Sequence, residues 1–243
     1  MGNHRLIVLI DIPVNVTLME NAAYFHKVES PVVELVLPEP NSTLSGTQPL
    51  TGRRSPLRPA VSPLIWTAML LSEQGWGVIG IDNDMRATFL GSKASTRPVI
   101  EDLKQSLPDY RHHDLDLRDR QDIRDLLAST RPDFIVHAAG QPSHDKAAEI
   151  PYDDFDVNAA GTMDLLVATR DYCRDAPFCF VSSNKVYGDR PNQLPLQELA
   201  TRYDFADGRD GIDENMPIDQ CLHSVFGVSK AAADLMCQEF GRN

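Results

Sequence analysis

The feature that most constrains the fold is a regular alternation of short apolar runs and helical stretches that begins at Trp76. The expected strands lie near residues 77–82, 110–113, 133–138 and 177–182, and stretches with helical patterning separate them. Alternation of this kind is typical of βαβ units, in which each helix returns the chain to a parallel strand. We therefore expect an α/β fold with a doubly wound parallel sheet.

The last apolar run indicates where a functional site would lie. Residues 178–181 are apolar, and the chain continues with Ser182, Ser183, Asn184 and Lys185. A buried strand that stops at Ser182 delivers polar side chains to the carboxyl edge of the sheet. Open α/β sheets bind their ligands at this edge, so we expect a site there.

Composition excludes several classes of protein. The chain has 243 residues, of which 42% are apolar, so it is long enough to bury a real core. Its formal net charge of −12 opposes nucleic acid as a partner, because affinity for that backbone comes mainly from Lys and Arg. The four cysteines lack CxxC spacing and a histidine cluster, and the sequence shows neither a signal peptide nor a membrane-length apolar run. We expect a cytoplasmic protein with reduced cysteines, no membrane contact and no metal.

Residues 1–65 differ in composition from residues 66–243. They contain eight of the seventeen prolines, and their five acidic and five basic residues cancel. Proline donates no backbone hydrogen bond and disrupts helix interiors, so we expect no regular element through 49–63. Residues 5–11 and 31–37 have the composition of short strands, although neither leads directly into a helix. We interpret 1–65 as an atypical, poorly packed leader that is distinct from a domain over 66–243.

A glycine-rich turn is missing from its expected place. Dinucleotide-binding folds need a first strand that runs directly into such a turn and a helix, whose backbone amides hold the pyrophosphate. Thr51 and Gly52 are followed by arginines and prolines instead of glycines. A literal GxGxxG occurs at Gly75, Gly77 and Gly80, but it follows a helical pattern and precedes a strand. We interpret these glycines as a helix end and a turn into the next strand.

Seven segments of the chain together resemble one family. They are GIDNDMR (80–86), YRHHDLDLRD (110–119), HAAGQPS (137–143), DFDVNAAGT (154–162), SSNKVYGD (182–189), GIDENMPIDQCLHS (211–224) and HSVFGVSKAAAD (223–234). Their order and spacing are similar to those of the extended short-chain dehydrogenase/reductase family of nucleotide-sugar epimerases and dehydratases. The resemblance covers residues 70–243 and implies an incomplete Rossmann-like, NAD(P)-binding fold. Either the gene was altered upstream of it or the N-terminus diverged naturally.

The resemblance implies NAD as the cofactor. Asp82 ends the second strand of the family pattern, where a carboxylate binds the hydroxyls of the adenosine ribose and repels a 2′-phosphate. His112 and His113 would point to opposite faces of a strand and so cannot share a metal ion. Asp119 would cap the helix that follows. The residues that the resemblance places at the cofactor are Asp82, Asn83, Asp116, Leu117, Ala138, Ala139, Gly140, Asn158, Ser182 and Lys230.

The catalytic residues implied by the resemblance include one departure from the family pattern. In these enzymes a tyrosine moves a hydroxyl proton, a lysine four residues later lowers the tyrosine pKa, and a Ser or Thr completes the proton path. Ser183 and Lys230 match the hydroxyl and the lysine, but Phe226 occupies the tyrosine position and has no proton to transfer. Lys230 then acts alone, or through His223, Tyr187 or a water. The simpler interpretation is that Phe226 only packs under its helix.

The implied function is NAD-dependent rearrangement of a nucleotide-linked sugar, most like inversion at C2 of a CDP-dideoxyhexose through transient oxidation. Gln141, Ser143 and His144 would face the sugar, as would the polar segment 192–219, which is either a lid or disordered. The helix at 226–240 would form a homodimer, and we expect the family's C-terminal substrate lobe to be absent. The alternatives are a catalytically inactive, nucleotide-binding remnant and a subunit that a second polypeptide completes.

Overall fold

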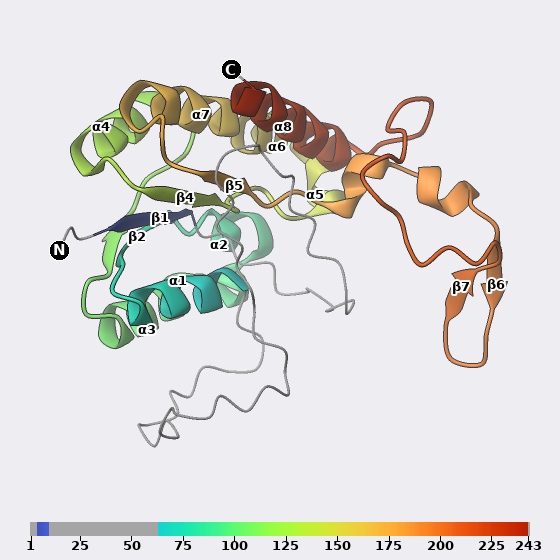
Figure 1. Ribbon diagram of the computed structural model, residues 1–243, viewed down its shortest axis with the longest axis horizontal. Coiled ribbons are helices and arrows are strands. Elements are labelled where there is room, and N and C mark those ends of the chain that lie inside the picture. Colours follow the sequence, from blue (N-terminus) through green and yellow to red (C-terminus); the bar gives the residue numbers. More distant parts are fainter. Residues whose placement is uncertain (1–3, 10–62, 243) are drawn as a thin grey trace.

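The computed structural model describes residues 4–9 and 63–242, which form a parallel sheet with helices on both faces (Figure 1). The strands of this sheet are β1 (Arg5–Leu9), β2 (Gly77–Ile81), β3 (Arg111–His113), β4 (Phe134–His137) and β5 (Phe178–Phe180). Their spatial order is β3-β2-β1-β4-β5, and each neighbouring pair is parallel. The predicted α/β fold with a doubly wound parallel sheet is thereby confirmed.

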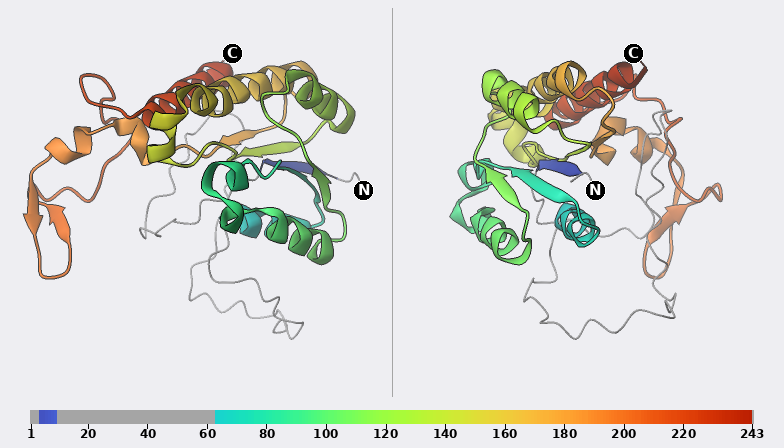
Figure 2. Two further views of the ribbon diagram at one scale, coloured as in Figure 1. Left: turned by 180° about the vertical axis from the view of Figure 1, so that it is seen from behind. Right: turned by 60° about the vertical axis from the view of Figure 1, so that its left-hand side comes forward.

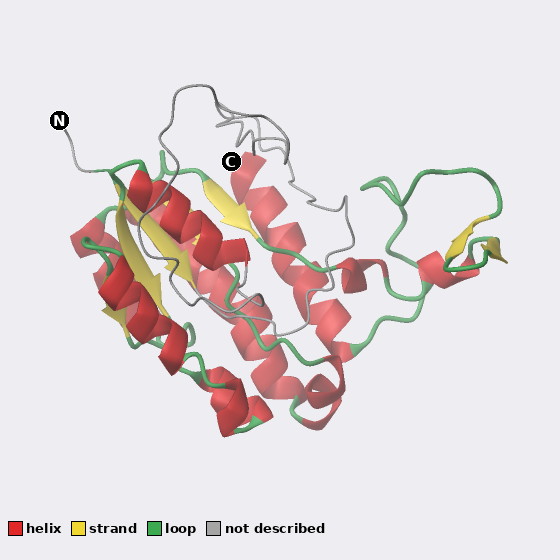
Figure 3. Ribbon diagram, turned by 90° about the horizontal axis from the view of Figure 1, so that it is seen from below, coloured by secondary structure: helices red, strands yellow, loops and turns green. Residues whose placement is uncertain are grey.

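The helices pack in two layers, one on each face of the sheet (Figure 1 and Figure 3). They are α1 (Pro63–Glu73), α2 (Met85–Leu90), α3 (Arg97–Ser106), α4 (Arg120–Thr130), α5 (His144–Glu149), α6 (Pro151–Phe155), α7 (Gly161–Tyr172) and α8 (Val225–Arg242). Val78 of β2 packs with Leu103 in the core beneath α1 and α3, whereas Ile79 packs with Leu127 beneath α4 and α7. Successive strand residues face opposite sides, so one strand contributes to both cores.

Strand β1 lies at the centre of the sheet, between β2 and β4. Ile7 is opposite Ile79 on one side and Ile135 on the other, and its side chain is fully buried. A parallel strand covered by helices on both faces consists of a continuous apolar run, and RLIVL has that composition. The strand expected at residues 5–11 therefore forms over residues 5–9, at the centre of the sheet, and residues 10 and 11 lie outside the described residues.

The expectation of a poorly packed leader over residues 1–65 does not hold for residues 5–9, because their pairing partners lie far along the chain. The strand expected at 31–37 lies outside the described residues, and so does the irregular stretch expected at 49–63 up to residue 62. The GxGxxG interpretation is confirmed: α1 ends at Glu73, Gly75 turns with φ +88°, and β2 begins at Gly77.

The helix expected at 153–172 is a continuous helical run from Pro151 to Tyr172 that contains one π turn, Asp156–Ala160. Segments of this kind are frequent at functional sites. The polar segment 192–219 contains a small antiparallel hairpin of β6 (Leu196–Glu198) and β7 (Tyr203–Phe205). Figure 2 shows this hairpin standing apart from the five-stranded sheet. Short 3-10 turns at Ser92–Ala94, Asn184–Tyr187 and Arg190–Gln193 complete the described elements.

Candidate functional site

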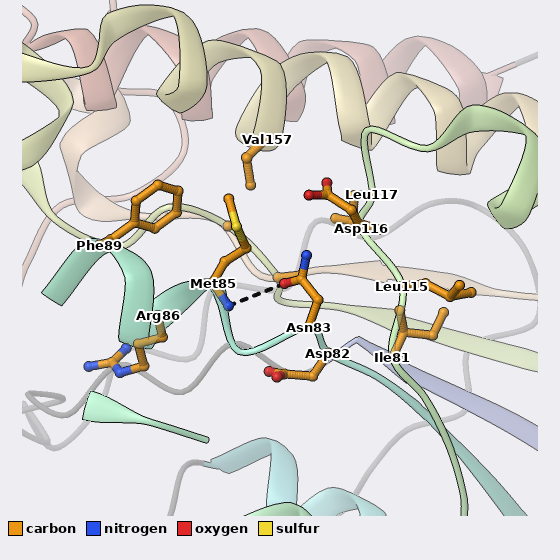
Figure 4. Close-up of a pocket in the computed structure, with 12 residues that line it drawn as sticks. Ile81, Asp82, Asn83, Met85, Arg86, Phe89, Leu115, Asp116, Leu117 and Val157 are labelled. Atoms are coloured by element: carbon orange, nitrogen blue, oxygen red, sulfur yellow. Dashed lines mark hydrogen bonds between the residues drawn. The ribbon is translucent and has the colours of Figure 1, made fainter. Parts of the chain in front are cut away.

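The candidate site lies at the carboxyl ends of β2, β3 and β4, where the following loops enclose a pocket (Figure 4). The pocket is lined by Ile81, Asp82, Asn83, Met85, Arg86, Phe89, Leu115, Asp116, Leu117, Ala139, Gly140 and Val157. Six of these residues belong to the set expected at a cofactor, namely Asp82, Asn83, Asp116, Leu117, Ala139 and Gly140. The structure thus brings six of the ten residues expected at the cofactor together at one sheet edge.

Asp82 follows β2 directly and is 8% exposed. Its Oδ1 accepts hydrogen bonds from the Asp84 backbone amide at 2.8 Å and from the Thr96 hydroxyl at 2.6 Å. Burial raises the pKa of Asp82, and the hydrogen bond from Thr96 opposes that rise. Figure 4 shows the Asp82 carboxylate turned away from Asn83 and Asp116. The carboxylate is therefore held in one orientation at the strand end.

Asn83 and Asp116 approach each other in the pocket from the ends of β2 and β3 (Figure 4). Asn83 Oδ1 accepts a hydrogen bond from the Met85 backbone amide at 3.2 Å. The Arg118 guanidinium, 2.8 Å from Asp116 Oδ2, holds the pKa of this carboxyl below its usual range. Arg118 also binds Asp153 of α6 at 2.9 Å. The loop after β3 is therefore fastened to α6, and it offers an ionised hydrogen-bond acceptor in the pocket.

The turn after β4 has no room for a side chain at Gly140. A Cβ atom built there would lie 2.6 Å from Asn158 Oδ1. That oxygen accepts a hydrogen bond from the Gln141 backbone amide at 2.8 Å, so Asn158 ties the β4 turn to the helical run, in line with its expected supporting role. The small residues Ala138 and Ala139 precede the turn. A backbone of small residues permits a ligand to approach closely.

A buried carboxylate, Asp154, joins this turn to α8. Asp154 is fully buried, and its Oδ1 accepts hydrogen bonds from Gln141 Nε2 at 2.9 Å and Asn158 Nδ2 at 3.1 Å. Its Oδ2 accepts a hydrogen bond from the Ser229 hydroxyl at 2.6 Å. Burial raises the pKa of Asp154, while these hydrogen bonds lower it without cancelling the rise. Each member of the network has a partner, as buried polar groups require.

The sequence reasoning did not identify Asp154 or Ser229, and it placed Gln141 facing the sugar. Gln141 is fully buried in the network instead. A signal was present, because Asp154 and Asn158 are four residues apart and interrupt the apolar face of one helix together. Ser143 caps α5 by accepting a hydrogen bond from the Lys146 amide at 3.1 Å, and His144 lies at the exposed start of that helix.

Lys230 reaches the carboxyl end of β5 from α8. It is 6% exposed, and its Nζ donates a hydrogen bond to the Val181 carbonyl at 3.0 Å. The same atom lies 4.3 Å from the centre of the Phe180 ring and 4.0 Å from a Cβ built on Gly140. Phe226 precedes Lys230 by one helical turn on α8. The amine is thus present beside the β4 turn, and no phenol stands one turn before it.

The two serines after β5 have different surroundings. The Ser182 hydroxyl donates to Asp234 Oδ2 of α8 at 2.6 Å, so Ser182 fastens the strand end to the helix that carries Lys230. Ser183 Oγ accepts a hydrogen bond from the Lys185 amide at 3.2 Å and begins the 3-10 turn. Ser182 therefore supports the site, and Ser183 lies at the start of the loop beyond β5.

His223 lies on the outer side of α8, away from Lys230. Its Nε2 donates to the Val186 carbonyl at 2.8 Å, and it lines a shallow groove with Val228 and Leu235 of α8. Lys230 is on the opposite, buried face of that helix. His223 and Lys230 therefore lie on different sides of α8, which does not favour a proton route through His223.

Residues 66–243 of the chain match the NAD dependent epimerase/dehydratase family. The chain belongs to this family. The likeness inferred from the seven sequence segments is thereby confirmed. Within residues 4–9 and 63–242, no helix combines the length and the apolar character that crossing a membrane requires.

Several curated family members are similar to part of the chain. CDP-paratose 2-epimerase from Salmonella typhi is 37% identical over 127 residues, which cover 52% of this chain and 37% of that protein. The dTDP-glucose 4,6-dehydratase from Neisseria gonorrhoeae is 28% identical over 173 residues, which cover 68% of this chain and 43% of that protein. The chain therefore spans less than half the length of these two relatives.

Solved structures of family members share the fold. The UDP-Glc/GlcNAc 4-epimerase from Campylobacter jejuni has a TM-score of 0.55 at 19% identity, with 73% of this chain and 46% of that chain covered. The UDP-glucose 4-epimerase from Bifidobacterium longum, solved in complex with NAD+ and UDP, has a TM-score of 0.54 at 22% identity, with 72% and 45% covered. The described part of the chain thus has the Rossmann fold of these epimerases.

Proposed function

We propose that this chain is an NAD-dependent nucleotide-sugar epimerase or dehydratase, most like CDP-paratose 2-epimerase, which inverts C2 of its sugar through transient oxidation. The observation that carries the proposal is the pocket in which Asp82, Asp116 and Gly140 lie together at the sheet edge. The 37% identity to CDP-paratose 2-epimerase over 127 residues supports the finer choice of substrate.

The residues at this edge fit NAD. A bound NAD would supply the hydride-transfer chemistry at the sugar carbon. Asp82 would accept hydrogen bonds from the adenosine ribose hydroxyls, and the small residues Ala139 and Gly140, which line the pocket, would let the cofactor approach the backbone of the β4 turn. Lys230 would hold the second ribose, and Ser183 would bind the reacting sugar hydroxyl. Asn158 and Ser182 support these positions through the hydrogen bonds already described.

Phe226 favours a second candidate function, which is nucleotide binding without turnover. A phenyl ring neither accepts nor donates the hydroxyl proton that must leave when the sugar carbon is oxidised. The buried Lys230 amine is held by the Val181 carbonyl and carries a positive charge suited to binding rather than to accepting a proton. In this case the chain is an NAD-binding remnant of the enzyme.

The proposal also includes a homodimer formed through α8. Val228 and Leu235 on the outer face of this helix are 50% and 52% exposed. Large apolar side chains that project from one helix face can be covered by the same face of a second copy. Sedimentation equilibrium tests this point, since Leu235→Glu should convert a dimer to a monomer. A wild-type chain that is already monomeric at high concentration would refute it.

Titration calorimetry with NAD tests the cofactor, using the chain as it stands and a version with a TGxxGxxG sequence restored before α1. A CDP-linked dideoxyhexose is then added to whichever version binds NAD. The near-ultraviolet absorbance of reduced nicotinamide reports oxidation of the sugar, and NMR reports inversion at C2.

The outcomes separate the two candidates. NAD binding followed by C2 inversion supports the epimerase. NAD binding without reduction of the nicotinamide supports the remnant. Failure of both versions to bind NAD refutes the two candidates together, because the pocket would then have another purpose.

A further inference from the structure

A small cluster of buried and half-buried polar groups surrounds the Asp82 carboxylate at the end of β2. Asp84 follows Asp82 by two residues and adopts a left-handed conformation, with φ 59°. Ser95 and Thr96 come from the turn before α3, and Thr96 is only 2% exposed. Side-chain hydrogen bonds, and not strand pairing, join the loop after β2 to the turn before α3. These hydrogen bonds determine the orientation of the Asp82 carboxylate.

Thr96 stands where a helix-capping residue is expected, but it does not cap the helix. Ser, Thr, Asp and Asn at this position normally accept a hydrogen bond from a backbone amide in the first turn. The Thr96 side chain makes no such bond to α3. Its hydroxyl donates instead to Asp82 Oδ1 at 2.6 Å. The Thr96 hydroxyl thus binds the Asp82 carboxylate at the end of β2 instead of capping α3.

Thr96 has a single hydroxyl proton, and we assign it to the hydrogen bond with Asp82 Oδ1, the nearer of two acceptors. Asp84 Oδ1 is more distant from the hydroxyl, at 3.1 Å, and already accepts the Thr96 backbone amide at 2.8 Å. The Asp84 amide donates to the same Asp82 Oδ1 at 2.8 Å. The Thr96 hydroxyl and the Asp84 amide therefore both donate to Asp82 Oδ1, which fixes the rotation of the Asp82 carboxylate.

The charged groups around Asp82 act on its pKa in opposite directions. The negative charge of Asp84 raises the pKa of Asp82, and the positive charge of Arg97 lowers it. Arg97 in turn lies 3.8 Å from Asp84 and donates to Asp114 at 2.7 Å. Tyr110, which directly precedes β3, is another titratable side chain near this carboxylate, and Arg86 lines the same pocket. Hydrogen bonds from Thr96 and Ser95 outweigh burial and lower the pKa of Asp84, so Asp84 stays ionised.

From this geometry we propose that Thr96 is a positioning residue that orients Asp82 and thereby sets the discrimination between NAD and NADP. The inference rests on the proposed cofactor function. An ionised, correctly turned carboxylate accepts hydrogen bonds from ribose hydroxyls and repels a 2′-phosphate. Hydrogen bonds to an ionised group favour its charged form, and Thr96 supplies such a bond inside a buried site. Loss of the hydroxyl should therefore weaken NAD binding and reduce the discrimination against NADP.

The test uses Thr96→Val, which keeps the shape but removes the hydroxyl, and Thr96→Ser, which restores it. Ser95→Ala is the matched control, because the Ser95 hydroxyl donates to Asp84 Oδ2 at 2.9 Å and not to Asp82. Calorimetric titration of each variant with NAD and with NADP, over a pH series, gives the ratio of the two dissociation constants. The version of the chain that binds NAD is used for all variants.

Thr96→Val is expected to weaken NAD binding about tenfold, the loss typical of a hydrogen bond to a charged group, and to weaken NADP binding less. The pH below which NAD affinity falls should move upward, because Asp82 then takes up its proton more readily. Thr96→Ser and Ser95→Ala should keep the wild-type ratio. An equal loss for both cofactors, or an unchanged pH profile in Thr96→Val, would show that Thr96 has only a structural role.

A measurement without cofactor separates this inference from the proposed function. Carbon-detected NMR titration of the side-chain carboxyls in the free chain should show a higher pKa for Asp82 in Thr96→Val than in wild type. If the chain binds neither cofactor but this shift occurs, the positioning role stands and the cofactor assignment fails. If the Asp82 pKa is the same in both proteins, the positioning role is refuted whether or not NAD binds.

Discussion

Lys230 donates a hydrogen bond to the carbonyl oxygen of Val181 at 3.0 Å, so an amine of α8 is fixed at the end of β5. The Phe180 ring supports it from one side, with 4.3 Å between Nζ and the ring centre. A cation over an aromatic face is stabilised by the charge distribution of the ring. The lysine that the resemblance assigns to the proton-transfer pair therefore lies at this strand end, and Phe226 stands at the position of the tyrosine.

Phe226→Tyr should raise turnover in whichever version of the chain binds NAD. The new phenol would stand one helical turn before Lys230, whose positive charge lowers a phenol pKa and so favours proton transfer. General acid–base groups contribute about a hundredfold or more to a rate, so a gain of that order is expected. Reduced nicotinamide formation in the presence of substrate measures it.

Phe226→Leu is the control for this substitution, because it changes the packing of α8 without adding a proton carrier. Its turnover should equal that of wild type. If Phe226→Tyr binds NAD, folds normally and shows no gain, then Ser183 and Lys230 do not form the family's standard site.

Asp154→Ala should lower the free energy of unfolding by about 3 kcal/mol. The substitution leaves the buried donors of Gln141, Asn158 and Ser229 without their common acceptor. Urea unfolding followed by circular dichroism measures the loss.

Asp153→Ala is a matched control, since the neighbouring carboxylate binds Arg118 on the surface and is 49% exposed. A surface ion pair contributes about 1 kcal/mol or less, so this variant should stay near wild type. Equal effects from the two substitutions would mean that the buried network does not stabilise α8.

Strands β2 to β5 were predictable because their signals are local. Strands β2, β4 and β5 are short apolar runs followed by small or polar residues, and Asp82 and Gly140 could be assigned to the sheet edge for the same reason. The central position of β1 was not predictable, because Ile7 pairs with Ile79 and Ile135, far along the chain. No glycine-rich turn follows β1 directly in the sequence, so the usual sign of a first strand was missing.

The supporting network of the site was hidden for a similar reason. Ser229 and Asp154 are 75 residues apart, and only the packing of α8 on α6 brings them together. A serine next to a conspicuous lysine carries no sequence signal of its own. The role of Thr96 could not be predicted either, since a threonine before a helix normally indicates a cap and not a contact to a distant strand end.

The last prediction concerns His137, which is fully buried at the end of β4. Its Nε2 is 2.8 Å from the Thr162 hydroxyl, and that hydroxyl donates to the Asn158 carbonyl at 2.6 Å. Thr162 must therefore accept from His137, which fixes the neutral ring with its proton on Nε2. Burial, helped by the positive charge of Lys230, lowers the pKa of His137 to about 3.

A histidine whose pKa is depressed by folding destabilises the protein in acid, because only the unfolded chain takes up the proton. The unfolded pKa is about 6.5, so the stability is fully present above that pH and declines as the pH falls from there toward 3. About 1.4 kcal/mol should be lost per pH unit within this window. In His137→Gln, which keeps a side-chain donor for Thr162, the decline in urea-unfolding free energy between pH 7.5 and about 5.5 should be smaller by that amount. His144→Gln, at a half-exposed position, should leave the wild-type profile unchanged. If the profiles of His137→Gln and wild type are parallel, His137 takes up its proton in the folded protein, and the neutral, buried ring described here is wrong.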